Sequence, residues 1–276
     1  MAAVVLALCA AALWGTGDFF GGLATRRVSV LIVLAWSQLI GFCGAVVWIA
    51  ASSAPRPGSG LAYALGAGLA GSIGLGCLYR GMAVGTMGIV APISATAPVV
   101  PLAFDVARGD VASALQWVGI ALALVGIVIV ARDPGSRGRP VAAGVGLALA
   151  AALGIGLFLT GLGEAARQSA PWAVGTARLG SMFMLVAVLA VTRTAPSLTR
   201  RLVPLVVAVG IFDTGANALV ALAASRGSIG IVGVLSSLYP IATILLARAI
   251  LHERLGPTRT AGGLVALSGA ALIAAG

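Results

Sequence analysis

Charged residues are scarce in this chain of 276 residues, in which Asp, Glu and Arg together make up 9% and lysine is absent. A soluble domain carries about 25% charged residues, so the composition excludes one. Hydrophobic residues make up 60% of the chain and are spread over its whole length. The composition is therefore typical of a polytopic membrane protein.

Residues that bind metals or form disulfides are also few. The one histidine, His252, cannot build a multi-histidine metal site. Cys9, Cys43 and Cys77 fall inside apolar runs without any Cys-x-x-Cys pair, and we expect them to be small buried hydrophobic residues and not disulfides or metal ligands. No phosphate-binding loop of the form G-x-x-x-x-G-K-[ST] occurs. We therefore expect no metal, no cofactor, no ATP site and no enzymatic activity.

The net charge of +10 comes from 17 arginines. These arginines stand singly or in pairs between apolar runs and form no basic stripe, which argues against nucleic-acid binding. Short basic loops between membrane spans explain the charge better.

Apolar runs that are each about long enough to cross a bilayer, which takes about 20 residues, follow one another along the chain. The runs are continuous and not alternating, which excludes a β-barrel. The predicted spans are 3–22, 30–51, 61–80, 86–104, 113–131, 141–162, 172–192, 203–224, 229–250 and 259–275. The sequence thus predicts an all-α membrane protein with ten transmembrane helices.

The two halves of the chain resemble each other on either side of the polar segment 132–140. Glycine, serine, proline and acidic positions recur at a shift of 142 or 143 residues: Gly88 with Gly230, Ser94 with Ser236, Pro98 with Pro240, and Asp110 with Glu253. Five helices per half is an odd number, so the halves must have opposite orientations in the membrane. We therefore predict a first repeat over 1–131 and an inverted second repeat over 141–276, the construction of many secondary transporters.

Asp213 lies at the middle of the predicted span 203–224, where a carboxylate costs roughly 2.5 to 3.5 kcal/mol on insertion scales. Asn217 follows one turn later on the same face, so both side chains are expected to face the bundle interior. Asp213 would carry a proton, bind a substrate amine, or pair structurally with an arginine of another helix.

Other polar residues also fall inside predicted spans. Arg178 lies about two turns into the span 172–192 and could bind a substrate carboxylate or phosphate, neutralise Asp213, or snorkel to the interface. Asp18 lies one turn after Trp14 and nearer one end of its span. Its carboxylate would either face the cavity, or reach water at the helix end by snorkelling or direct solvation. Gln38 occupies nearly the place of Arg178 in the first half and is expected to face inward.

The stretch "ALVALAASRGSIGIVGVLSSLYPIATILLARAILHERLGPTRTAGGLVALSGAALIAAG" (218–276) combines a tight turn, a Ser-rich helix with a central proline, an acidic residue and a Gly-rich last helix. The first half repeats these features with Pro98, Asp110 and Gly126, and "ALWGTGDFFGGLATRR" (12–27) adds a Trp-Gly opening. Over its whole length the chain resembles the EamA-type transporters of the drug/metabolite transporter superfamily.

The resemblance implies a multi-pass secondary transporter of the cytoplasmic membrane that exports a small polar metabolite, such as an amino acid or related amphiphile, by alternating access. Protons are a candidate partner, and a monomer or loose homodimer is expected. The alternative is an uncoupled facilitative carrier, an exchanger or a channel-like pathway. The cavity residues would be Asp213, Asn217, Arg178, Asp18, Trp14, Gln38 and Tyr239.

Pro98 and Pro240 each remove a helix hydrogen bond, so we expect paired kinks that serve as gating elements, with tolerated membrane prolines as the alternative. Arginine is more frequent in the odd-numbered loops, nine against four, which favours both termini outside. Relatives in the family are usually drawn with both termini in the cytoplasm, so both orientations stay open.

Overall fold

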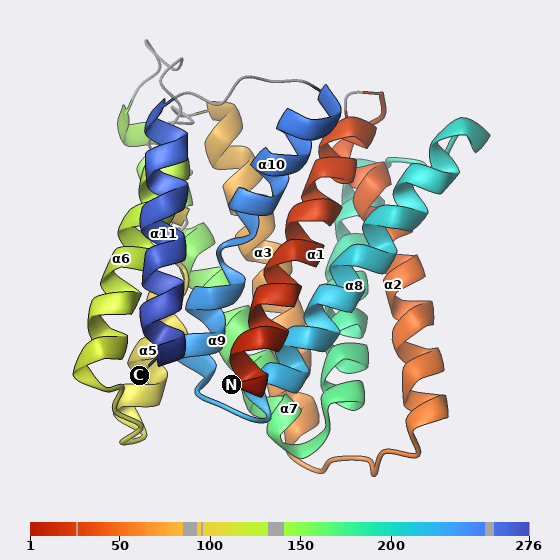
Figure 1. Cartoon of the computed structure of the whole chain (residues 1–276). Helices are drawn as coiled ribbons and strands as arrows, with labels where there is room; N and C mark the ends of the chain where they lie inside the picture. The colour runs from red at the N-terminus through yellow and green to blue at the C-terminus, as the bar shows by residue number, and fades with distance from the viewer. Residues whose placement is uncertain (26, 85–92, 95, 132–140, 252–256, 276) are drawn as a thin grey trace.

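The computed structural model describes residues 1–25, 27–84, 93–94, 96–131, 141–251 and 257–275 as a bundle of long apolar helices (Figure 1). Within these ranges the chain contains no strand, so the all-α prediction is confirmed. Five of the helices, α1, α2, α3, α7 and α8, contain stretches long and apolar enough to cross a membrane. The predicted total of ten spans stays a prediction.

The first half begins with three helices at the places of the first three predicted spans: α1 (Ala2–Thr25), α2 (Val30–Ser52) and α3 (Gly60–Val84). Farther along the described part of this half are α5 (Val99–Ala107) and α6 (Ala114–Ala131). A left-handed glycine, Gly109 (φ 86°), lies in the connection between α5 and α6, where a side chain would strain the backbone.

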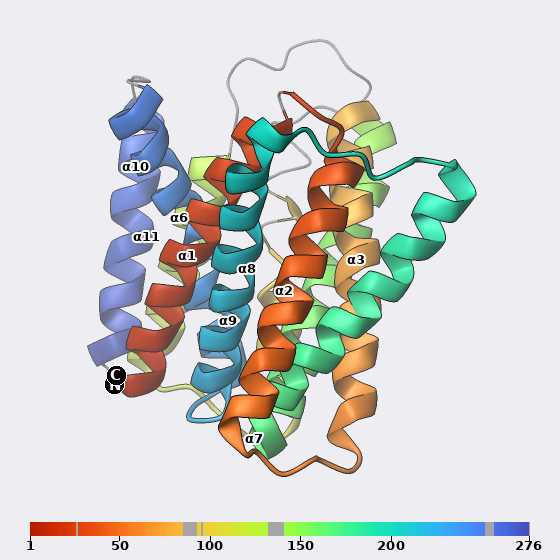
Figure 2. The ribbon, with the colours of Figure 1, turned by 90° about the vertical axis from the view of Figure 1, so that its right-hand side faces the viewer.

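The second half begins with α7 (Val141–Thr192), which covers two predicted spans in succession. Ser169 (φ −163°, ψ 108°) is not helical and divides α7 into two arms, with Pro171 in the first turn of the second arm, where its missing N–H removes no helix bond. The arms meet at the lower end of the molecule (Figures 1 and 2). After a short 3-10 turn, Arg200–Leu202, come α8 (Val203–Ala224), α9 (Ile229–Ser236), α10 (Tyr239–Leu251) and α11 (Pro257–Ala275).

The two repeated prolines lie at helix breaks and not at kinks within continuous helices. The predicted span 229–250 is divided into α9 and α10, and Pro240 is the second residue of α10. Pro98 directly precedes α5. A proline in the first turn of a helix loses no intrahelical hydrogen bond, so each proline begins a new helix at equivalent places of the two halves.

Glycines allow several helix pairs to pack with their backbones in contact. A Cβ at Gly74 of α3 would lie 2.9 Å from the carbonyl carbon of Gly154 in the first arm of α7, and a Cβ at Gly68 would collide with the carbonyl oxygen of Ala177 in the second arm. On the other side of the bundle, Gly119 of α6 approaches Gly269 of α11 in the same way. Small residues at such contacts are how membrane helices gain van der Waals packing.

The two ends of the bundle can be told apart by the direction of α1 and α9. A Cβ at Gly227, just before α9, would lie 3.0 Å from the Cβ of Ala3, so α1 and α9 begin at the same end. We call this the α9 end and the other the α10 end. Both chain termini lie at the α9 end (Figures 1 and 2).

Gly126→Ala is expected to destabilise the protein. The new Cβ would lie 2.6 Å from the Cβ of Ala266, and overpacking of this kind costs about 1–3 kcal/mol. The midpoint of thermal unfolding in detergent should fall accordingly. Gly146→Ala is the matched control, because its Cβ would meet nothing within 4 Å. An unchanged midpoint for Gly126→Ala would contradict the close α6–α11 contact.

Candidate functional site

A buried ion pair lies where α2, the second arm of α7, and α8 meet. The Arg178 guanidinium NH2 is 2.6 Å from Asp213 Oδ2, and its NH1 donates a hydrogen bond of 2.5 Å to Gln38 Oε1. The Arg178 side chain is 5% exposed and that of Asp213 is 33% exposed. The structure therefore brings together three residues that the sequence indicated, from three different helices.

A glycine makes this contact sterically possible. A Cβ at Gly41, one turn after Gln38 on α2, would collide with Thr214 Oγ1 and lie 3.4 Å from Arg178 Nε. On the facing side, a Cβ at Gly210 of α8 would lie 2.9 Å from the Cβ of Ile40. The α2 and α8 backbones thus approach closely enough to enclose the guanidinium.

Several buried polar atoms beside the ion pair have no hydrogen-bond partner among the described residues. They are Arg178 Nε, Thr214 Oγ1 and Asn217 Oδ1. Asn217 and Thr214 are 6% and 9% exposed, which confines them to the interior of the bundle. Because a buried polar group without a partner is costly, these atoms can receive a polar ligand or water.

Asp18 is exposed although it lies on the inward face of α1. Ala7, Ala11, Asp18 and Gly22 are spaced by four, seven and four residues, which places them on one stripe of the helix. Ala7 (0% exposed) and Ala11 (5% exposed) belong to the core, whereas Asp18 and Gly22 are exposed. A Cβ at Gly22 would meet nothing within 4 Å. The inward face of α1 is thus packed toward the α9 end and open toward the α10 end.

Two aromatic residues lie next to the break between α9 and α10. The rings of Trp14 on α1 and Tyr239 at the start of α10 meet edge to face, with centroids 6.4 Å apart and an interplanar angle of 80°. Thr243 Oγ1 donates a 3.0 Å hydrogen bond to the carbonyl oxygen of Gly15, which holds α10 against α1. Trp14 precedes Asp18 by one helical turn, so an aromatic surface adjoins the exposed carboxylate.

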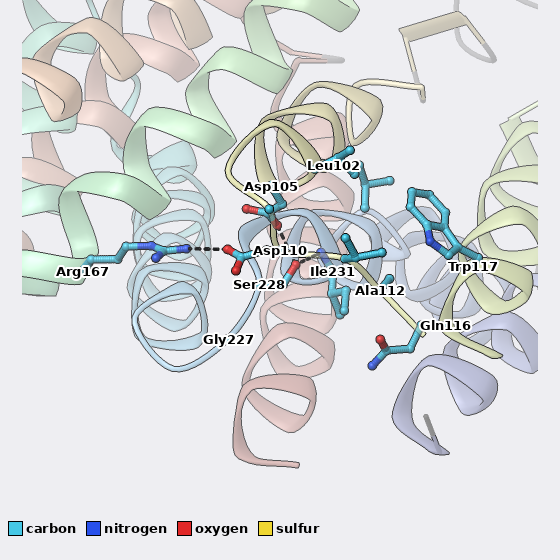
Figure 3. A pocket seen from close by; sticks show the side chains of 13 residues that line it. Leu102, Asp105, Asp110, Ala112, Gln116, Trp117, Arg167, Gly227, Ser228 and Ile231 are labelled. Carbon is cyan, nitrogen blue, oxygen red and sulfur yellow. Dashed lines mark hydrogen bonds and ion pairs between the residues drawn. The ribbon is translucent and has the colours of Figure 1, made fainter. Parts of the chain in front are cut away.

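A second polar cluster borders a cavity of about 480 Å³ at the α9 end (Figure 3). Asp105 of α5 is 2% exposed. Its Oδ2 accepts hydrogen bonds from Ser228 Oγ (2.6 Å) and from the backbone N–H of Gly230 (2.5 Å) at the start of α9. The polar and aromatic residues that line the cavity with it are Asp110, Gln116, Trp117, Arg167 and Ser228.

Ion pairs connect the end of α5 and the connection after it to the first arm of α7. Arg108 NH1 is 2.8 Å from Glu164 Oε1, Arg167 Nε is 3.5 Å from Glu164 Oε2, and Arg167 NH2 is 3.9 Å from Asp110 Oδ2. The Arg108 and Asp110 side chains are 44% and 55% exposed. Pairs as exposed as these contribute about 0–1 kcal/mol each, so the buried Asp105 contact is the stronger link at this end.

Asp105, Gly41 and Thr214 were missed by sequence reasoning. The predicted span 86–104 ended one residue before Asp105, whereas α5 continues to Ala107. Pro101, Leu102 and Asp105 share one face of α5 and are its buried residues, but the sequence alone does not show which face is covered. Glu253 and His252 lie outside the described residues.

Fold and site together define a polytopic membrane protein whose polar side chains face one another inside the helix bundle. The sequence matches the model of the EamA-like transporter family over residues 1–132 and again over residues 142–275. The chain therefore belongs to the EamA-like transporter family, within the drug/metabolite transporter superfamily. It is accordingly a multi-pass membrane transporter and not an enzyme.

The fold is similar to that of a solved crystal structure whose title describes it only as a protein. The two superpose with a TM-score of 0.81 over 98% of this chain and 95% of the other, at 19% sequence identity. This likeness extends to the fold alone. No curated protein matches the sequence.

Asp213→Asn is expected to destabilise the bundle, because it leaves the Arg178 guanidinium buried without its counter-ion. The loss should exceed the roughly 1 kcal/mol of a surface pair. It should stay below the roughly 3–5 kcal/mol of fully buried pairs, since the Asp213 side chain is 33% exposed. Thermal unfolding in detergent would measure it.

The double variant Arg178→Gln/Asp213→Asn should recover much of the stability lost in Asp213→Asn, because no unpaired charge remains. Asp110→Asn, in an exposed pair, is the matched control and should change stability little. A double variant less stable than Asp213→Asn would contradict the pairing.

Proposed function

We propose that this protein is a secondary transporter that exports a small polar metabolite with an ammonium group, an amino acid or related amphiphile, across the cytoplasmic membrane by alternating access. The observation that carries the proposal is the Arg178–Asp213 ion pair inside the bundle of an EamA-like transporter, with Asp18 nearby on α1. A Cβ at Gly17, the residue before Asp18, would lie 3.6 Å from the backbone nitrogen of Asp213. Charged side chains in membrane helices are rare and mark substrate or ion pathways.

The charges of the cluster favour a cationic group on the substrate. Arg178 already contacts Asp213 and Gln38. Asp18 is exposed and has no hydrogen bond or ion pair within the described chain. One positive and two negative formal charges leave the cluster with a net charge of −1. The ring of Trp14, one turn away, can add a cation–π contact with an ammonium group.

Carboxylates of this kind also provide a means of proton coupling. A carboxylate that holds either a proton or an ammonium group, but not both at once, links outward movement of the substrate to inward movement of protons. Asp18 is exposed, and Asp213 is 33% exposed at its side chain. Both are therefore assigned this role in the proposal, with Gln38, Asn217 and Tyr239 as neutral contacts of the cavity.

The two ends of the bundle support alternating access. The inward stripe of α1 is packed at Ala7 and Ala11 and exposed at Asp18 and Gly22. This is the arrangement expected of a state that admits substrate from the α10 end only. The helix breaks beside Pro98 and Pro240 occupy equivalent places in the two halves, as expected of paired gating elements.

The first experiment is a transport screen in proteoliposomes with pools of radiolabelled amino acids and other amines, with and without an imposed pH gradient. We expect gradient-driven transport of an ammonium-bearing substrate by the wild type. Asp18→Asn and Asp213→Asn should each reduce it by roughly 30-fold or more, as for a lost charge contact of about 2 kcal/mol. Asp110→Asn at the α9 end should leave it unchanged.

Three other results would redirect the proposal. A transport rate that is the same with and without the pH gradient would favour the uncoupled facilitative carrier. Transport of anions in preference to amines would contradict the role of Asp18. Transport unaffected by Asp213→Asn would make that residue the structural partner of Arg178 and nothing more.

A further inference from the structure

The first and second halves of the chain meet directly at the α9 end, through α5 and α9. A Cβ at Gly230 of α9 would lie 2.7 Å from the Cα of Leu102, and a Cβ at Gly233 would lie 3.1 Å from Cγ of Pro101. Each of these helices adjoins one of the two helix breaks. Opening of this end therefore requires α5 and α9 to separate.

Asp105 provides the polar part of this contact. Its Oδ2 receives one hydrogen bond from Ser228 Oγ and one from the N–H of Gly230. Ser228 is also the N-cap of α9, where its Oγ accepts a 3.2 Å hydrogen bond from the N–H of Ile231. The carboxylate thus lies at the N-terminus of α9, where the helix dipole favours a negative charge.

The contact separates the cavity at the α9 end from the interior of the bundle. Figure 3 shows Asp105 and Ser228 beside Asp110, with the Trp117 ring on the other side of the cavity. Ile231 also lines the cavity, whereas Leu235 and Ser236, one turn farther along α9, are 0% exposed. Residues beyond the Asp105 contact are therefore sealed from this end.

The sequence repeat places no equivalent carboxylate at the other end. At the shifts of 142 and 143 residues that relate the halves, Asp105 corresponds to Ala247 or Arg248, while Ser228 corresponds to Thr86 or Gly85. Inverted repeats bring equivalent residues to opposite ends of the bundle. The Asp105 contact thus distinguishes one end of the transporter from the other.

The contact is also incompletely satisfied. Asp105 Oδ1 is buried and has no hydrogen-bond partner among the described residues. A buried carboxylate oxygen without a partner raises the free energy of the closed state, and water would provide hydrogen bonds to it once α5 and α9 separate. The two hydrogen bonds to Oδ2 stabilise the closed arrangement, and the unpartnered Oδ1 lowers the free energy needed to open it.

We propose that Asp105 is a positioning residue that latches the α9 end shut, and that release of Ser228 and Gly230 from its carboxylate opens that end. The inference rests on the proposed function for its place in a transport cycle. It concerns residues outside the central cluster of Asp18, Arg178 and Asp213.

Cysteine accessibility tests the latch without any substrate. In a variant with Cys9, Cys43 and Cys77 replaced by Ala, Ser236→Cys places a reporter thiol in the sealed interior. A membrane-impermeant maleimide is applied to each face in turn, in intact cells and inverted vesicles. We expect Asp105→Asn and Ser228→Ala to raise the labelling rate about tenfold, as for loss of a hydrogen bond to a charged group, and only from the α9 end.

Three control variants separate latching from helix capping and from general polarity. Ser228→Thr keeps the hydroxyl group, so its reporter thiol should be labelled as slowly as in the reporter protein that retains Ser228. Asp110→Asn removes an exposed carboxylate from the same cavity and should change the rate by less than about twofold. Ser228→Asp keeps an acceptor for the Ile231 N–H but faces Asp105 with a second carboxylate, so it should label fastest.

Two outcomes would overturn the latch. One is an unchanged labelling rate in folded Asp105→Asn and Ser228→Ala proteins, and the other is an equal increase from both faces, which indicates a general structural role. If Asp105→Asn fails to fold, Ser228→Ala and Ser228→Asp decide, and slow labelling of both overturns the proposal. A negative result leaves the transport proposal standing, because labelling requires no substrate.

Discussion

A charged group that is buried inside a membrane bundle needs a counter-ion, and this constraint organises the middle of the protein. The guanidinium of Arg178 is neutralised by Asp213 and held by Gln38, so α2, α7 and α8 have to converge on one point. Gly41 and Gly210 allow that convergence, since any side chain there would hold the helices apart. Asp18 is exposed and has no ion pair within the described chain, so it remains available to a charged ligand.

Much of the fold could be predicted from the sequence, because lipid requires helices to be long, apolar and internally hydrogen-bonded. The apolar runs locate α1, α2, α3, α6 and α8 within a few residues. The breaks at Pro98 and Pro240 were expected only as kinks, since sequence shows that a helix bond is lost but not whether the helix restarts. The predicted spans 141–162 and 172–192 correspond to the two arms of α7, and the break at Ser169 lies between them.

The site was predictable where polarity contrasts with an apolar run. Asp213, Arg178 and Gln38 stand out for this reason, and the structure brings them together. Asp105 lies at a predicted span end, where an acidic residue is unremarkable, and only the approach of α9 makes it a buried contact. Gly41 was not indicated because its importance depends on a neighbour from another helix.

The two arms of α7 pack against the same helix, and this has a consequence for local stability. Gly68 and Gly74 fix the second and first arms to α3 over much of its length. Near the bend between the arms, Trp172 Nε1 donates a hydrogen bond to the carbonyl oxygen of Ala54, in the connection between α2 and α3. Gln168 Oε1 accepts a hydrogen bond from the N–H of Gly60, the first residue of α3. The free energy of local opening should therefore be high in α3 and α7, whose amide hydrogens should be among the slowest to exchange.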